Sequence, residues 1–213
     1  MFEISREIED YILNQTGQQD DLLYELYRET HKKVLHPRML SGKLQGRMLE
    51  LISKMLMPYR ILEIGTYTGY SAICLARGLA PEGWLDTIEI NDELEDFIRH
   101  YLNRSGMEEK INLHIGDARE ILTQLQGPYQ LIFIDGDKRQ YPDYLIHCKE
   151  LLAPGGTLMA DNVLWDGKVL DRVTRDAHTQ GIRQFNDMVR DDSSLESLIL
   201  PVRDGLMMAR KKM

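Results

Sequence analysis

The sequence lacks the features that mark secreted, membrane-spanning and general nucleic-acid-binding proteins. It has two cysteines in 213 residues, and both Cys74 and Cys148 fall inside apolar helical patterns, where reduced core thiols are expected. No apolar run approaches the ~18 residues that a membrane span needs, and the acidic N-terminus is unlike a secretory signal. The net charge of −8 disfavours a broad surface for nucleic acid. These shortages indicate a cytoplasmic protein.

Two groups of basic residues stand out in this chain of net negative charge. The first group comprises Lys32, Lys33, Arg38, Lys43 and Arg47, and the second comprises Lys168, Arg172, Arg175 and Arg183. Solvated helix faces and ends account for most of these side chains. A basic surface that joined both groups beside an active site would instead indicate an RNA substrate.

Internal repeats, low-complexity tracts and linkers are also missing, so residues 1–213 are expected to form one domain. Apolar residues at three- and four-residue spacing predict helices in the segment 1–57, around a loop at HPRMLSG. In the segment 58–213, strands alternate with helices. Strands are predicted at 60–65, 83–90, 111–116, 129–135 and 156–160. Helices are predicted at 68–80, at 92–106 with Asp92 as the N-cap, from Ala118, at 141–152 and at 175–191.

The last two predicted strands, 195–202 and 206–212, flank the tight-turn dipeptide Asp204-Gly205 and so indicate a β-hairpin. The alternation predicts an α/β fold with a doubly wound, Rossmann-like sheet that is mostly parallel and ends in this antiparallel pair. Open sheets of this kind bind ligands at the carboxyl ends of their strands. The carboxylates expected at that edge are Glu63, Glu89, Asp135 and Asp161.

The loop after the first strand, EIGTYTGYS, lacks both common phosphate-binding patterns, G-x-G-x-x-G and G-x-x-x-x-G-K-[ST]. Gly65 allows a tight turn and a close approach between backbone and ligand. Glu63 would repel a pyrophosphate and suits a cationic ligand, such as the ammonium group of an amino acid. Glu89, at the end of the second strand, is placed to bind a ribose diol through its two oxygens. The alternative for Glu63 is a loop carboxylate that satisfies backbone donors.

Five motifs together, LEIGTYTGYS, TIEI, GDA, FIDGDK and ADNVLW, resemble the cation-dependent O-methyltransferases that use S-adenosylmethionine. That family includes catechol and caffeoyl-CoA O-methyltransferases and many bacterial relatives, and the resemblance runs from about Ser41 to the C-terminus. It implies a class I methyltransferase fold with S-adenosylmethionine as the cofactor. The positions that match its cofactor-binding residues are Met39, Ser41, Glu63, Gly65, Thr66, Ser71, Glu89, Asp117, Ala118, Asp135 and Asp137.

The fourth predicted strand ends at Asp135, and the fifth ends at Asp161 and Asn162. Three hard oxygen ligands are too few for a closed calcium cage, but they suit an octahedral Mg²⁺ that keeps positions for water and substrate. The resemblance implies the same three metal ligands, with Mn²⁺ or Ca²⁺ as substitutes for Mg²⁺. An Asp-Asn pair that caps a turn would explain Asn162 but not Asp135.

Lys138 lies three residues after Asp135, at a position that the resemblance implies is catalytic. A lysine ammonium with a pKa near ~10.4 is a poor base, and a neighbouring dication disfavours this charged form, so neutral lysine becomes available. The resemblance also implies that Lys138, Trp165 and Asp166 face the acceptor. The alternative interpretations are a surface lysine paired with Asp135 or Asp137 and a tryptophan packed in its loop.

These features predict a metal-dependent O-methyltransferase whose small phenolic acceptor is a vicinal diphenol of the catechol or hydroxycinnamate type. Two departures from the catechol-specific branch weaken a strict catechol assignment: its aromatic gate is absent, and Leu198 stands where that branch has a carboxylate. The alternatives are a tRNA hydroxyuridine O-methyltransferase and a cofactor-binding module without turnover. The resemblance implies that the helical segment 1–57 shapes the acceptor pocket and forms the contact of a homodimer.

Overall fold

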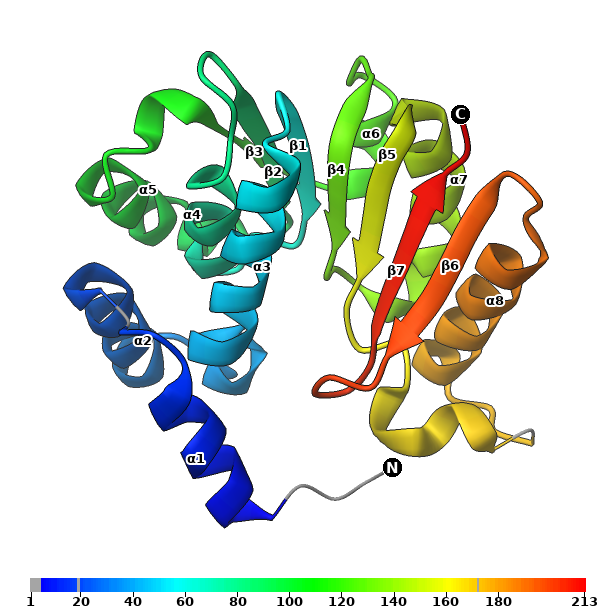
Figure 1. Ribbon diagram of the computed structural model, residues 1–213, viewed down its shortest axis with the longest axis horizontal. Helices are drawn as coiled ribbons and strands as arrows, with labels where there is room; N and C mark the ends of the chain where they lie inside the picture. The colour runs from blue at the N-terminus through cyan, green and yellow to red at the C-terminus, as the bar shows by residue number, and fades with distance from the viewer. Residues whose placement is uncertain (1–4, 19, 172) are drawn as a thin grey trace.

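A seven-stranded sheet runs through the centre of the molecule (Figure 1). The computed structural model of the protein describes residues 5–18, 20–171 and 173–213. The strands are β1 (Arg60–Ile64), β2 (Trp84–Glu89), β3 (Ile111–Ile115), β4 (Tyr129–Ile134), β5 (Leu152–Ala160), β6 (Leu195–Leu200) and β7 (Leu206–Lys211).

The strands lie in the order β3-β2-β1-β4-β5-β7-β6. Neighbours among β1 to β5 pair in parallel, whereas β7 pairs antiparallel with both β5 and β6. The chain therefore winds outward from β1 in both directions, and a hairpin forms one edge of the sheet. The predicted doubly wound sheet and its antiparallel pair are confirmed.

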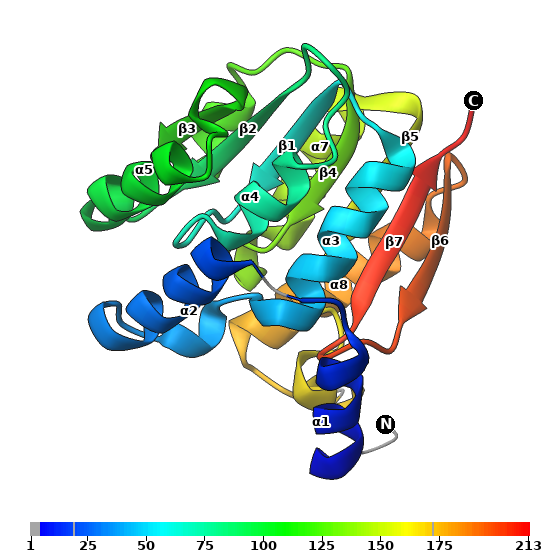
Figure 2. The ribbon, with the colours of Figure 1, turned by 60° about the vertical axis from the view of Figure 1, so that its left-hand side comes forward.

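Helices cover both faces of the sheet (Figure 2). The α-helices are α1 (Arg6–Gln15), α2 (Asp21–Lys33), α3 (Gly42–Leu56), α4 (Tyr70–Ala76), α5 (Glu95–Arg104), α6 (Ala118–Leu122), α7 (Tyr141–Leu151) and α8 (Ala177–Asp191). Short 3₁₀ helices are η1 (Pro37–Met39), η2 (Asp92–Leu94), η3 (Glu108–Lys110), η4 (Lys138–Gln140) and η5 (Trp165–Leu170).

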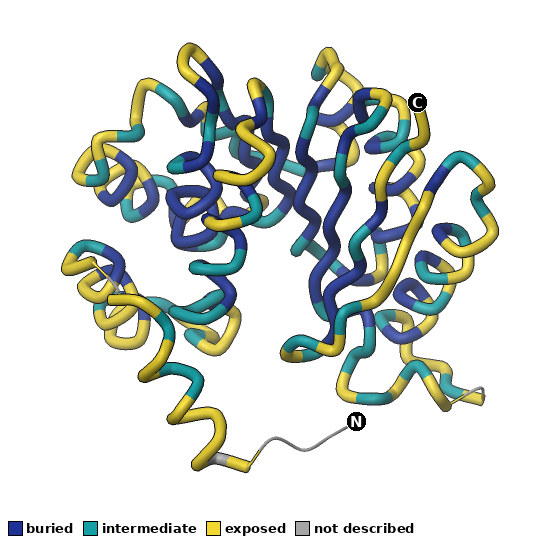
Figure 3. Tube along the Cα trace, in the orientation of Figure 1, coloured by how far each residue is buried: buried dark blue, intermediate teal, exposed yellow. Residues whose placement is uncertain are grey.

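Two hydrophobic cores result, one on each face. The first core joins α6, α7 and α8 to the sheet and includes Cys148 and Phe185. The second joins α2, α3, α4 and α5 to the other face, through residues such as Leu26, Leu49 and Ile73. The strands are buried between these layers, whereas α1 is largely exposed (Figure 3). The N-terminal helices α2 and α3 thus share a core with the sheet.

Both cysteines are free and buried, as the sequence predicts. Within the described part of the chain, no helix combines the length and the apolar composition that crossing a membrane requires.

Two local predictions are wrong in detail. Asp92 does not cap a long helix, because the chain first forms η2, where the Asn91 side chain accepts a hydrogen bond from the Glu93 amide at 3.1 Å. The fifth strand, predicted at 156–160, begins earlier, because β5 starts at Leu152. A shift of register between Tyr129 and Leu131 accommodates it, and Gly155 supplies a left-handed φ of 74° there.

The register of the three central strands brings their loops together. Ile64 at the end of β1 pairs with Ile134 of β4, which in turn pairs with Ala160 of β5. The next residues on β4 and β5, Asp135 and Asp161, are therefore neighbours at the carboxyl edge of the sheet. Their amides continue the ladder and donate to the carbonyls of Ile64 (2.7 Å) and Ile134 (3.0 Å).

Candidate active site

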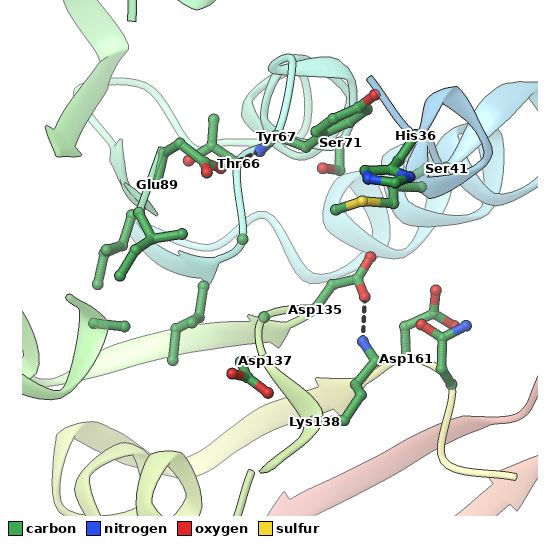
Figure 4. A pocket seen from close by; sticks show the side chains of 18 of the residues that line it. His36, Ser41, Thr66, Tyr67, Ser71, Glu89, Asp135, Asp137, Lys138 and Asp161 are labelled. Carbon is green, nitrogen blue, oxygen red and sulfur yellow. Dashed lines mark hydrogen bonds and ion pairs between the residues drawn. The ribbon is translucent and has the colours of Figure 1, made fainter. Parts of the chain in front are cut away.

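A cavity of about 1170 Å³ lies at the carboxyl edge of the sheet. Figure 4 shows Glu89 and Thr66 toward one end, Asp161 toward the other, and Asp135 and Lys138 between them. Most of the site residues expected from the sequence line this cavity. They are Met39, Ser41, Gly65, Thr66, Ser71, Glu89, Ala118, Asp135, Asp137, Lys138, Asp161, Asn162 and Trp165.

Glu63 lies behind the cavity wall and is fully buried. Its Oε2 accepts a hydrogen bond from the Thr87 hydroxyl at 2.5 Å, and its buried Oε1 has no partner. Burial raises the pKa of Glu63 to about 8, although the hydroxyls of Ser71 and Thr87 oppose this rise. Glu63 is therefore a buried group behind the cavity and does not line it.

Two further expected residues serve local structure instead of lining the cavity. Asp117 caps α6 by accepting the Arg119 amide at 2.8 Å, and it forms an ion pair with the Arg119 guanidinium at 2.7 Å. Asp166 donates its amide to Asp204 Oδ1 at 2.6 Å, which ties its loop to the hairpin between β6 and β7. Neighbouring residues, Ala118 and Trp165, line the cavity in their place.

Glu89 ends β2 and is mostly buried, with its carboxylate held in place by backbone amides. Oε2 accepts from the Tyr67 amide at 2.6 Å, and Oε1 accepts from the Asn91 amide at 2.9 Å. Burial raises the pKa of Glu89, and these backbone hydrogen bonds offset part of the rise. The carboxylate is thus fixed before any ligand arrives.

Gly65 allows the loop after β1 to lie directly against the loop after β4. Its φ of 103° is strained for any other residue. An added Cβ would also lie only 2.4 Å from the carbonyl oxygen of Asp135. The sequence predicted a close approach between the Gly65 backbone and a ligand; the approach that the structure shows is to the loop after β4.

Lys138 is held by two groups and is only 7% exposed. Its Nζ donates to Asp135 Oδ1 and to the Tyr141 hydroxyl, at 2.7 Å each. The Tyr141 hydroxyl in turn donates to the carbonyl of Asp161 at 3.0 Å. Burial and the charge of Asp161 raise the pKa of Asp135 to about 6, despite the opposing effect of Lys138. The amine is thus a fixed, buried group beside two carboxylates.

Asp161 has a partner that the sequence does not reveal. The Nε2 atom of Gln45, on α3, donates to Asp161 Oδ2 at 2.7 Å, while the Gln45 Oε1 atom is buried without a partner. A single glutamine in an amphipathic helix is expected on the solvent-facing side. The sequence gives no sign that Gln45 is only 1% exposed. The sequence analysis also missed Tyr141, which is fully buried, and Arg203, which the hairpin between β6 and β7 brings to the cavity.

Backbone strain gathers around the cavity. Among the described residues, eight that are not glycine have a left-handed φ, and five of these line the cavity. The five are His36, Tyr67, Asn162, Trp165 and Arg203. Such conformations cost of order 1–3 kcal/mol each and cluster at functional sites. The clustering independently marks this cavity as the functional site.

An aromatic wall borders the cavity next to the metal-ligand candidates. The rings of Trp165 and His178 stack with their centroids 5.9 Å apart and an angle of 18° between the planes. The Lys168 ammonium lies 5.7 Å from the Trp165 ring centroid. The Trp165 Nε1 donor is buried without a hydrogen-bond partner. This wall provides a flat, largely apolar surface.

The two basic groups contribute little to the cavity. Lys32 and Lys33 pair with Glu29, and Arg47 pairs with Glu50. Arg38 is the member of the first group that lines the cavity. Of the second group, Arg172 lies outside the described residues, and Lys168, Arg175 and Arg183 are not part of the cavity lining.

The fold and the site define a class of protein. A doubly wound sheet with a terminal antiparallel hairpin, an acidic residue after β2 and no phosphate-binding loop are features of S-adenosylmethionine-dependent methyltransferases. The family model described as O-methyltransferase matches residues 14–212. The chain belongs to the O-methyltransferase family, as its resemblance predicts.

Individual relatives agree with this assignment. A catechol O-methyltransferase of Niastella koreensis is 33% identical over 202 residues, which cover 93% of this chain and 91% of that protein. A solved structure of the O-methyltransferase TomG from Streptomyces achromogenes, in complex with SAM, matches with a TM-score of 0.92 and 29% identity over 100% of both chains. An O-methyltransferase from Bacillus cereus in complex with SAH matches with a TM-score of 0.91 and 30% identity over 97% of each chain.

The contact at Gly65 generates a stability prediction. Gly65→Ala should destabilise the protein in two ways, through its positive φ and through the clash with the Asp135 carbonyl. Gly106→Ala is the matched control, because Gly106 has a φ of 69° but open space around its Cβ position. The control should lose about 1–2 kcal/mol in urea unfolding from the φ penalty alone. Equal losses of stability in the two variants would show that the loops after β1 and β4 can separate without an energetic cost.

Proposed function

We propose that residues 1–213 form one methyltransferase domain that moves a methyl group from S-adenosylmethionine to a hydroxyl of a vicinal diphenol, with a divalent ion at the acceptor. The observation that carries this proposal is the meeting of Asp135, Asp161 and Asn162 beside the buried amine of Lys138. Family membership supports an enzyme over a cofactor-binding module without turnover. The buried free thiols of Cys74 and Cys148 support a cytoplasmic location.

The cofactor would occupy the end of the cavity near Glu89. A carboxylate with both oxygens already oriented by backbone amides suits the two hydroxyls of a ribose. At the other end, Ser41 and Met39 border the cavity where the methionine part would lie. The cavity volume of about 1170 Å³ has room for this cofactor and a small acceptor.

The residues present fit a divalent ion of the magnesium type. Within the described ranges no three His, Cys, Asp or Glu side chains form a metal-binding group, but two carboxylates and an amide oxygen are a suitable partial set for Mg²⁺. Asp135 and Asp161 repel each other, which contributes to the raised pKa of Asp135. A dication would relieve this repulsion. Asp135, Asp161 and Asn162 would hold it, with Mn²⁺ or Ca²⁺ as substitutes.

The chain's own residues would orient the acceptor and move its proton. Lys138 Nζ, steered by Asp135 and Tyr141, is placed to accept the proton of the reacting hydroxyl. The Trp165 and His178 rings would pack against the acceptor ring. When bound, the divalent ion would supply Lewis-acid charge that favours the ionised hydroxyl. Most of the acceleration then comes from positioning the oxygen in line with the sulfonium methyl.

A vicinal diphenol suits this site because two oxygens on adjacent carbons fill two neighbouring ligand positions. The names of relatives, a catechol and a caffeoyl-CoA O-methyltransferase, support this acceptor class. A tRNA hydroxyuridine is the second candidate. The positions of the two basic groups disfavour it, because Arg38 is the one described member of either group that lines the cavity. Incubation with labelled cofactor and Mg²⁺, against a diphenol panel and bulk tRNA, decides between the two.

The cofactor assignment predicts that Glu89→Gln weakens S-adenosylmethionine binding. The change removes a charge-assisted hydrogen bond of about 1.5–3 kcal/mol, so calorimetry should show a dissociation constant raised about 10- to 100-fold. Glu93→Gln, an exposed neighbour in η2, serves as the control. An unchanged dissociation constant for Glu89→Gln would remove it from the ribose site.

The metal assignment predicts that EDTA abolishes methyl transfer and that Mg²⁺ or Mn²⁺ restores it. Asp161→Ala should also abolish transfer to a diphenol, because the acceptor loses its anchor. Cofactor affinity should stay close to that of the wild type, since Glu89 lies at the other end of the cavity. Full activity in EDTA would disprove the metal assignment and the role given to Lys138.

Gln45→Met tests whether the hydrogen bond from Gln45 to Asp161 contributes to metal binding. Methionine keeps the length of glutamine but cannot donate to Asp161, so the carboxylate loses its orientation. Outer-shell changes typically lower metal affinity about 10- to 100-fold, which Mn²⁺ binding followed by electron paramagnetic resonance would measure. Gln124→Met, at an exposed position, is the control. Equal Mn²⁺ affinity in both variants would show that Gln45 has only a packing role.

A homodimer is part of the proposal. The N-terminal helices expose apolar side chains to solvent, with Met55 75% exposed as the extreme case. The set comprises Ile8 and Tyr11 on α1, Tyr24 and Tyr27 on α2, and Leu51, Met55 and Leu56 on α3. Burying such a surface against a second copy is favourable. Analytical ultracentrifugation at micromolar concentration should report a dimer, and a monomer would contradict this assignment of the helices.

A further inference from the structure

Arg203 is the residue that the hairpin between β6 and β7 contributes to the cavity wall. Its Nη1 donates to the carbonyl of Ser41 at 3.1 Å and lies 3.9 Å from Asp161 Oδ2. The side chain is 33% exposed. Because a guanidinium carries five N–H donors, the Ser41 carbonyl engages a small part of its capacity. A cation that pairs with Asp161 and keeps further N–H donors therefore borders the acceptor end of the cavity.

The backbone at Arg203 is strained. Its φ of 51° lies in the left-handed region, which costs little for glycine but is unfavourable for a long side chain. The turn is held in this shape from outside, since Leu164 and Val163 donate their amides to the carbonyls of Asp204 and Gly205 at 2.9 and 3.0 Å. Strain that the surroundings maintain is a mark of a functional position.

The charges of the loaded site point to what this cation binds. Under the proposed function, a divalent ion would offset the carboxylates of Asp135 and Asp161, and Lys138 would take the proton of the acceptor. The guanidinium of Arg203 would then lack an anionic partner. Two other arginines, Arg38 and Arg139, line the cavity, and Arg139 already pairs with Asp137 at 2.5 Å.

We propose that Arg203 binds a carboxylate substituent on the diphenol and so determines which acceptors the enzyme prefers. This inference rests on the proposed function and narrows its acceptors to those diphenols that carry a carboxylate, recognised by Arg203. The planar fork of arginine matches the two oxygens of a carboxylate. Leu198, the position that a catechol-specific enzyme would use on this hairpin, lies exposed on β6 outside the cavity lining.

The test compares two probes that differ only in charge, 3,4-dihydroxybenzoate and 3,4-dihydroxybenzyl alcohol. Calorimetry on the full chain with Mg²⁺ and S-adenosylhomocysteine measures binding without turnover. Wild type should bind the benzoate more tightly. Arg203→Gly, which suits the positive φ and should fold, is expected to weaken benzoate binding about 10- to 100-fold and to leave alcohol binding unchanged. Arg203→Lys should restore part of the preference, and Arg210→Gln, at the far end of β7, should alter neither.

Each remaining outcome separates the two proposals. Equal weakening of both probes in Arg203→Gly, or no weakening of either, would overturn the role of Arg203. Wild-type binding that favours the alcohol would do the same. If the wild-type enzyme binds the cofactor but methylates neither probe, the proposed diphenol activity is overturned. The calorimetric comparison would then still test the role of Arg203.

Discussion

Asp135 and Asp161 follow neighbouring parallel strands, so the sheet itself holds two largely buried carboxylates side by side. Repulsion between like charges is strong in such a place because the protein interior screens charge poorly. Three surrounding groups offset this repulsion. Lys138 binds Asp135, Gln45 donates to Asp161, and Arg203 lies close to Asp161. The proposed divalent cation would relieve the same repulsion.

The loops around these carboxylates are tied to one another as well as to the strands that precede them. Gly65 lets the loop after β1 rest on the carbonyl of Asp135, and the Asp166 amide binds Asp204 across to the hairpin. Left-handed residues such as Asn162 and Trp165 are maintained by these ties. The strain is distributed among several loops, so the site keeps one shape in which Lys138 and the metal-ligand candidates stay aligned.

Sequence patterns predicted the sheet and most of the cavity lining, because hydrophobic periodicity and strand-end residues are local signals. They were less successful with orientation. Glu63 and Glu89 both sit at strand ends, yet Glu63 turns into the core and Glu89 borders the cavity. Asp117 and Asp166 likewise lie beside residues that line the cavity. A motif identifies the loop, but the path of its backbone decides which side chain faces the ligand.

The sequence by itself determined the order of helices and strands, the acidic strand ends and the family, since each depends on residues within a few positions of one another. The tertiary structure decided which distant residues complete the site. Gln45 reaches Asp161 across 116 residues of sequence, and Arg203 reaches Ser41 across 162. Those contacts depend on how α3 and the hairpin pack on the sheet. Packing of this kind sums many weak contacts over the whole chain, so no short stretch of sequence carries its signal.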